Sequence, residues 1–332
     1  MILSEEVYKG KTTNGLMRHI RDKHKTNIRG TNQKQELLNM GYYHGYKALR
    51  YIKERKNDQQ YSDFEQIKYI YNFDNELKKI FYPTLIRIET SLKNRLIDYL
   101  VPNINPSIEY IYSKYLTDYT RFEPTHRKYK KYLKRKLDLR SKIDETIAYH
   151  YGKGNPVISH FFHNSKPVPL WAYFEVISFG EFGNFIYCLH KDNKIEFTDI
   201  LGINHSGMNQ NGRILENIIF TLTSLRNSVM HNLIIFDCRF NKYDQSGQIK
   251  QYLENMTGVS NIQFKNIEDF LVLIVFLLKN LNTTKKELNK IINEFEISIK
   301  RLEDKIPRSS YFEILGTDVN NKIIQLKIFA KK

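Results

Sequence analysis

The chain has 332 residues, of which 41% are hydrophobic, and its 52 Lys and Arg residues exceed its 36 Asp and Glu residues, giving a net charge of +16. This basic excess suits a polyanion such as nucleic acid, although an A/T-rich coding sequence also enriches lysine. Two cysteines argue against a disulfide framework or a cysteine-rich zinc site, and predict a reducing, cytoplasmic location. The start lacks a signal segment, and the most apolar run, residues 270–278, is too short to cross a bilayer. No P-loop or Rossmann glycine pattern is present, and we expect no cofactor. We also expect no metal ion, because His160 and His163 have metal-like spacing but no further ligands.

The first hundred residues are expected to form the N-terminal helical part of the core. Residues 34–56 predict a helix that is interrupted near Gly41. The tyrosines at this interruption could stack on bases or pack around a close helix contact. Residues 64–100 predict one long helix.

Two carboxylates are candidates to support an arginine described below, Arg226. Glu89 falls on the apolar face of the helix at 64–100, where an ionised carboxylate needs a partner. That partner is either Arg226 or Lys93, one helical turn further on. Glu175, in the helix expected after Pro169, could orient Arg226 or His231.

Residues 101–165 are interpreted as a basic helical insertion, because prolines interrupt the helical pattern at its start. Within it, residues 127–140 carry eight basic side chains and one acidic side chain. Four apolar positions keep helical spacing and could dock this helix, namely Tyr129, Tyr132, Leu133 and Leu137. The opposite side would present charge to phosphates, although most charge runs are solvated faces. The predicted RNA-binding residues are Arg127, Lys128, Lys130, Lys131, Lys134, Arg135, Lys136 and Arg140.

A helical pattern in the second half of the chain carries a polar motif. Its apolar positions recur every three or four residues, namely Leu215, Ile218, Ile219, Leu222, Leu225, Val229 and Leu233. Arg226 lies at the edge of this stripe, whereas Asn227 and His231, four residues apart, share a face turned away from it. Ile234 and Ile235 are expected to continue the apolar character around this helix. We therefore predict that this face meets a second protomer.

The pattern of an arginine followed five positions later by a histidine occurs in two relevant places. In the copy from Arg121 to His126, Pro124 forbids a regular helix, so that copy is set aside. The other copy, from Arg226 to His231, is expected to lie well inside a helix. An alternative interpretation is that Arg226 makes an internal ion pair and His231 packs in an interface.

The C-terminal part is expected to begin with an apolar helix at residues 266–281. Thr283 and Thr284 are predicted to cap the helix that follows. The alternating pattern at residues 323–329 predicts a small β-hairpin within the tail, residues 306–332.

The order of four segments resembles a known family. Residues 37–43, 88–94, 169–180 and 225–232 together resemble the abortive-infection proteins of the AbiD and AbiF type, bacterial phage-defence proteins with a HEPN-like helical core. The Arg-Asn-x-x-x-His motif itself resembles that of the HEPN ribonucleases. The resemblance covers roughly residues 15–100 and 165–240. It implies a predominantly all-α fold, a HEPN-like helical bundle with the basic insertion and the small C-terminal hairpin added.

The resemblance also implies an activity, which is metal-independent RNA cleavage by two facing motifs. Since this chain offers one helical copy, it would need a homodimer. His231 would act as general base or acid, and Arg226 would hold the phosphate. Asn227 would orient the histidine or the phosphate by hydrogen bonding, with Asn232 as an accessory. A cognate structured non-coding RNA would bind the insertion and restrain the nuclease.

These expectations divide the chain into residues 1–100, 101–165, 166–305 and 306–332, with the motif helix in the third part.

Two other functions remain open. In the first, the protein is a non-catalytic RNA-binding or scaffold protein of a defence system. In the second, it is a substrate-binding helical partner of a nucleotidyltransferase.

Overall fold

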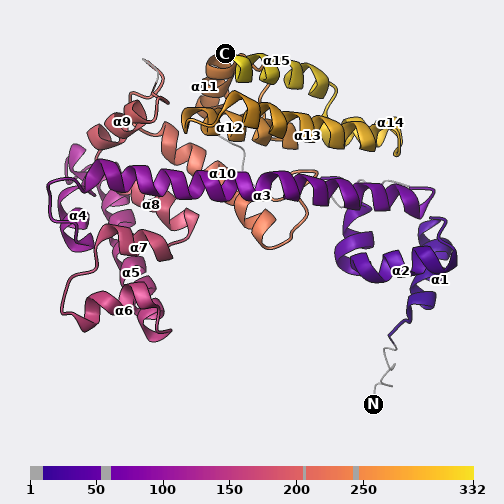
Figure 1. Cartoon of the computed structure of the whole chain (residues 1–332), viewed down its shortest axis with the longest axis horizontal. Coiled ribbons are helices and arrows are strands. Elements are labelled where there is room, and N and C mark those ends of the chain that lie inside the picture. Colours follow the sequence, from indigo (N-terminus) through magenta and orange to yellow (C-terminus); the bar gives the residue numbers. More distant parts are fainter. Residues whose placement is uncertain (1–9, 54–60, 205–206, 242–246) are drawn as a thin grey trace.

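The computed structural model in Figure 1 describes residues 10–53, 61–204, 207–241 and 247–332. Every regular element within these residues is helical, which confirms the predicted all-α class. The first elements are α1 (Thr13–His24), α2 (Gly30–Met40), the π-helical turn η1 (Gly41–Lys47), α3 (Phe64–Leu100), α4 (Ile108–Lys114), the 3-10 turn η2 (Asp118–Arg121), α5 (Arg127–Gly152) and α6 (Pro156–His163). The remaining helices are α7 (Leu170–Val176), α8 (Phe179–Cys188), α9 (Lys191–Ile200), α10 (Ile214–Met230), α11 (Gly247–Thr257), α12 (Ile267–Asn280), α13 (Lys285–Glu303), α14 (Arg308–Leu315) and α15 (Val319–Lys331).

The longest element, α3, runs through the length of the molecule and joins its parts (Figure 1). Its 37 residues match the long helix predicted at 64–100. Asp63 caps its start, since the Asp63 carboxylate accepts the backbone N–H of Glu65 and Gln66 accepts the N–H of Asp63. Buried side chains along α3 pack against both α10 and α13. The helix therefore contributes to the motif region and to the C-terminal layer at once.

The predicted interruption near Gly41 is confirmed as the π-helical turn η1, which follows α2 directly. A Cβ atom on Gly45 would lie 2.5 Å from the carbonyl oxygen of Met40, so this wider turn requires glycine. The rings of Tyr42 and Tyr46 stack with their centroids 5.7 Å apart, and Tyr46 is fully buried. Tyr46 is thus a packing residue of the N-terminal helices rather than a platform for bases.

Residues 101–165 form α4, η2, α5 and α6, gathered at the opposite end of α3 from α1 and α2 (Figure 1). The helix α5 packs against α8 and η2. Its inward face consists of Tyr132, Lys136, Leu139, Ile143, Thr146 and Ile147. The prediction that Leu137 docks this helix was wrong, because that side chain is 57% exposed. The next residues along the helix that are apolar and correctly spaced, Leu139 and Ile143, form its contact face instead.

The C-terminal layer contains α11 to α15 and lies along one side of α3 (Figure 1). Its centre is α12, which buries an uninterrupted run of twelve side chains, Ile267 to Leu278. Thr284 caps α13 as predicted, and Glu287 returns the reciprocal bond of a capping box. Within the described ranges, no helix combines the length and the apolarity that a membrane span requires.

The tail does not form the predicted hairpin, because residues 306–332 fold into α14 and α15. On α15 the buried side chains include Ile323, Leu326 and Ala330, and the exposed ones include Ile324 and Ile328. This spacing of three and four residues is helical. The short apolar run at 323–329 fits both the helical period and the two-residue period of a strand. Lys322 completes the buried face, with its Nζ 2.6 Å from Oδ1 of Asp269 on α12.

Candidate functional site

The motif lies on α10, which is fixed between α3 and α8. Six of the seven predicted stripe residues are buried, namely Leu215, Ile218, Ile219, Leu222, Leu225 and Val229. The seventh, Leu233, is 50% exposed. Contact with α8 is close at Gly183, where a Cβ atom would lie 2.9 Å from the ring of Phe220. The helix therefore has little freedom to rotate, and the direction of its polar side chains is set by packing.

The motif helix ends immediately before His231, earlier than predicted. The N–H of Asn232 donates to the carbonyl of Val229 at 3.2 Å, and the N–H of Leu233 donates to the carbonyl of Ser228 at 2.8 Å. Asn232 has a φ of 52°, so these bonds form a Schellman ending with asparagine in the left-handed position. His231 is the C-cap residue and lies at the helix end rather than within a continuing helix.

The segment after this ending is buried against α3. The carboxylate of Asp74 accepts the backbone N–H groups of Ile235 and Phe236 at 2.8 and 2.9 Å. Both Ile234 and Ile235 are buried. They belong to the core of their own protomer, so the prediction that they extend an outward apolar face of the helix was wrong.

The same part of α3 also fixes Asn232. The Nζ atom of Lys78 donates a hydrogen bond of 2.8 Å to Oδ1 of Asn232 and lies 2.8 Å from Oδ2 of Asp74. Asn232 was predicted as an accessory of the chemistry. Its backbone conformation and this contact give it a structural role, which is to end the motif helix.

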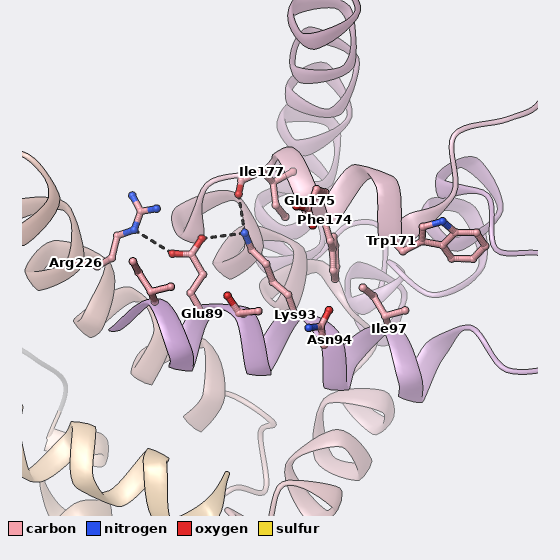
Figure 2. A pocket seen from close by; sticks show the side chains of 11 residues that line it. Glu89, Lys93, Asn94, Ile97, Trp171, Phe174, Glu175, Ile177 and Arg226 are labelled. Atoms are coloured by element: carbon pink, nitrogen blue, oxygen red, sulfur yellow. Dashed lines mark hydrogen bonds and ion pairs between the residues drawn. The ribbon is translucent and has the colours of Figure 1, made fainter. Parts of the chain in front are cut away.

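Arg226 is held by a carboxylate on α3 (Figure 2). Its Nε donates a hydrogen bond of 3.0 Å to Oε2 of Glu89. The other carboxylate oxygen accepts a bond of 2.9 Å from Nζ of Lys93, which also donates to the carbonyl of Ile177 at 2.7 Å. Both partners considered for Glu89 thus bind it together, which explains how this carboxylate can lie on a buried face. Sequence reasoning missed the link from Lys93 to α7, for which the chain carries no local signal.

Glu89 and Arg226 line a cavity of about 360 Å³ between α3 and α7. Asn94 contributes to its α3 side, and Trp171 and Glu175 contribute to its α7 side. Figure 2 shows Arg226 at one end of this row of side chains and Trp171 at the other. The cavity therefore joins a cationic end to an aromatic end.

Glu175 was predicted to orient Arg226 or His231. It lines this cavity, but its carboxylate binds neither of them. It is exposed and makes no hydrogen bond or ion pair with another described residue. The described part of the chain contains no group of three or more His, Cys, Asp or Glu side chains placed to hold a metal ion.

Asn227 and His231 are exposed at the outer end of the motif. An Nη atom of Arg226 donates to the side-chain oxygen of Asn227 at 3.3 Å. The imidazole of His231 makes no hydrogen bond or ion pair with any described residue. A guanidinium can bind a phosphate through paired donors, and an imidazole can take up or release a proton near neutral pH. The motif therefore presents both groups to a ligand that approaches from outside.

The basic helix α5 exposes most of the predicted RNA-binding side chains, but one of them is buried. Lys136 is 8% exposed and lies over the ring of Tyr112, with Nζ 4.5 Å from the centroid. Burial lowers the pKa of this lysine. Lys136 therefore belongs to the packing between α4 and α5, and cannot reach a phosphate from this position.

The other basic residues of α5 differ in how firmly they are engaged. Arg135 donates to the side chain of Asn184 at 2.6 Å and lies over the ring of Tyr187, which ties α5 to α8. Lys134 and Arg140 pair with acidic residues one turn further along α5, and Lys128 lies over a phenylalanine ring. Among the described residues, none forms an ion pair or hydrogen bond with the side chains of Arg127, Lys130 or Lys131.

Comparison with known proteins adds a family assignment. A family model described as Abi-like protein matches residues 35–237. This range covers more than half of the chain, from α2 to the segment after α10, and it includes the basic residues 101–165. No curated protein and no solved structure matches the chain.

Proposed function

Because the chain belongs to the Abi-like protein family, we propose that it acts in abortive infection against phage as a metal-independent endoribonuclease of the HEPN type. One observation carries the enzymatic part of this proposal. Arg226, Asn227 and His231 lie at the accessible end of a buried helix, and Arg226 is held by Glu89 at the edge of a polar cavity. The net charge of +16 suits RNA as the substrate.

The reaction follows from the chemistry of these side chains. The 2′-hydroxyl of the RNA attacks the adjacent phosphorus while His231 takes up its proton as general base. The bond to the 5′ oxygen then breaks, leaving a 2′,3′-cyclic phosphate and a 5′-hydroxyl. Arg226 stabilises the charge that develops on the phosphate oxygens, and Asn227 helps to orient the guanidinium. The departing oxygen needs a proton donor, which a second His231 would supply.

A homodimer would bring that second histidine to the site. The other sequence copy of the motif starts at Arg121, which ends a short 3-10 turn, so this copy is not displayed on a regular helix. The Nε atom of Arg121 lies 3.2 Å from Oδ1 of Asp118, so this arginine is already paired. Exposed apolar side chains near the motif support a symmetric contact. They are Tyr82 and Ile86 on α3 and Leu233 after α10.

The helix α5 would bind a small structured RNA that restrains the nuclease. Its exposed side chains Arg127, Lys130, Lys131 and Lys134 project from one segment, where they can neutralise neighbouring phosphates. Because α5 packs on α8, which in turn packs on α10, an RNA held there would lie on the elements that support the motif.

The test compares the wild-type protein with His231→Ala on total bacterial RNA in the presence of EDTA. Loss of the imidazole should reduce cleavage by about 10² to 10⁴-fold, and the wild-type products should carry 2′,3′-cyclic phosphates. His160→Ala is the matched control, because it removes an exposed histidine from α6. Equal cleavage by wild type and His231→Ala would refute the enzymatic proposal. RNA binding without any cleavage would favour the non-catalytic RNA-binding protein instead.

A further inference from the structure

The end of the cavity remote from Arg226 holds the only tryptophan of the chain, Trp171. Its side chain is 43% exposed. The backbone that precedes it is fixed, because the N–H of Leu170 donates to the carbonyl of Pro106 at 2.8 Å. The N–H of Ile108 likewise donates to the carbonyl of Val168 at 3.0 Å. The indole is therefore displayed at the mouth of the cavity from a rigid segment.

Two polar side chains that line the same cavity have no partner in the part of the chain that the structure describes. Asn94, on α3, and Glu175, on α7, are both exposed and both line it. Neither makes a hydrogen bond or ion pair with another described residue. An amide offers both donors and acceptors, whereas a carboxylate only accepts. The aromatic end of the cavity thus combines a flat apolar surface with groups that can recognise the edge of a planar ligand.

We propose that this end of the cavity binds one unpaired base of the RNA, a proposal that rests on the proposed ribonuclease function. The base stacks on Trp171, its edge bonds to Asn94 and Glu175, and its phosphate lies toward Arg226. The face of α3 from Glu89 to Ile97 spans about 12 Å at 1.5 Å per residue, which leaves room for a nucleotide along it. Single-stranded RNA is therefore the substrate class of this site.

The carboxylate makes the subsite selective. Adenine, cytosine and guanine offer an exocyclic amino group whose N–H Glu175 can accept, whereas uracil presents carbonyl oxygens on either side of its single N–H. Oligonucleotides of cytidine should bind more tightly than those of uridine. Glu175→Gln, whose amide can also donate, should remove most of this difference.

The single tryptophan provides a direct measurement in the unaltered protein. Hexanucleotides of 2′-O-methylcytidine lack the attacking hydroxyl, so they bind without being cleaved. Titration with this probe should quench the fluorescence of Trp171 in a saturable way, because a base stacked on the ring alters its emission. Saturation is followed independently by the anisotropy of a labelled copy of the probe. Saturated binding with unchanged Trp171 fluorescence would overturn the proposal, and so would the absence of binding.

The same anisotropy assay, applied to variants, measures how much stacking on Trp171 contributes to the affinity for the probe. Trp171→Ala should weaken binding about tenfold to hundredfold, whereas Trp171→Phe, which keeps an aromatic ring, should stay within a few-fold of wild type. Phe162→Ala is the control, because it removes an aromatic side chain of similar exposure, 49%, from outside the cavity. Equal weakening by Phe162→Ala and Trp171→Ala would overturn the proposal.

The assays separate this inference from the proposed function. If His231→Ala abolishes cleavage while Trp171→Ala binds and cleaves like wild type, the nuclease stands and the base subsite is refuted. If the probe quenches Trp171 and Trp171→Ala loses affinity while wild type cleaves no RNA, the subsite stands and the nuclease is refuted.

Discussion

The Nε atom of Arg226 lies 3.0 Å from Oε2 of Glu89, although 137 positions separate the two residues in the sequence. This contact joins the motif helix to α3 at the edge of the cavity (Figure 2). The Nε–H group of the guanidinium is therefore occupied, and the direction of the remaining N–H groups is fixed. A phosphate that binds Arg226 would meet donors that are already oriented.

Glu89→Gln tests whether this orientation matters. The amide keeps the shape but loses the charge, so the guanidinium should be less firmly held and kcat should fall about tenfold to hundredfold. Lys93→Met is the matched variant, because it removes the other partner of the same carboxylate and leaves Arg226 paired. Its kcat should fall less than that of Glu89→Gln. Equal kcat values for wild type and Glu89→Gln would show that the contact is only structural.

Two variants of Asn232 test its assigned role in ending the motif helix. Asn232→Gly accepts the left-handed conformation and loses only the bond to Lys78, so the free energy of unfolding should change by about 1 kcal/mol or less. Asn232→Val should lose about 1 to 3 kcal/mol, because a β-branched residue is strained at this φ. Urea denaturation measures both. If Asn232→Gly were folded but unable to cleave RNA, the asparagine side chain would have a chemical role after all.

Leu233→Lys tests the proposed dimer. The charge would have to be buried in a symmetric contact, so the variant should be monomeric at concentrations where the wild type is dimeric, and cleavage should fall with it. Ile328→Lys is the control, since it changes an apolar residue of similar exposure, 53%, on α15. Sedimentation velocity distinguishes the two states. A wild-type protein that is monomeric and fully active would contradict the dimer.

Charge reversal on α5 tests the proposed RNA-binding face. Changing Arg127, Lys130, Lys131 and Lys134 to Glu should weaken binding to a structured RNA by orders of magnitude. The dependence of log K on log salt should also become shallower, by about 0.7 to 0.9 for each phosphate that is no longer neutralised. Reversal of three exposed lysines on α13, Lys285, Lys286 and Lys290, provides the control. If both sets of changes alter the salt slope equally per charge, α5 is no specific RNA-binding face.

The buried carboxyl of Glu268 predicts a pH dependence of stability. Burial, and then the neighbouring Asp269, raise the pKa of Glu268 from an ordinary value of 4.5 to about 8. The folded protein therefore binds a proton between these two pH values that the unfolded chain releases, so this residue makes stability fall as pH rises from about 5 to 8. Glu268→Gln should flatten that decline in thermal melts. Glu123→Gln, which changes an exposed carboxylate, should leave the slope unchanged.

The motif helix shows which features the apolar spacing of the sequence predicts and which it does not. Six stripe positions from Leu215 to Val229 were predicted correctly, because burial between α3 and α8 favours the helical period. The end of the helix was not predicted, since Leu233 and Ile235 continue an apolar pattern. It depends on the left-handed conformation of Asn232 and on Asp74, which is remote in sequence and binds the next segment. Two residues were predicted as possible partners of Glu89, namely Arg226 and Lys93, and in the structure the carboxylate binds both.

The errors elsewhere have similar causes. Lys136 was placed on the RNA-binding face because a lysine in a basic run is usually solvated, yet two tyrosines from outside the run, Tyr112 and Tyr119, enclose it. Residues 323–329 were assigned to a hairpin because a short apolar run satisfies two periods at once. Tertiary packing decides such cases, and α15 packs its buried face, which includes Ile323 and Leu326, against α12 and α13.

The proline within α3 gives the site a mechanical property. Pro83 cannot donate a hydrogen bond to the carbonyl of Lys79, so α3 lacks one of its internal backbone hydrogen bonds at this point. Before it, Asp74 anchors the segment that follows the motif helix, and after it, Glu89 anchors the side chain of Arg226. The two contacts that hold the motif thus lie on opposite sides of this missing hydrogen bond in one continuous helix. The angle of α3 at Pro83 therefore sets where Glu89 lies relative to Asp74, and with it the direction in which the guanidinium of Arg226 is held.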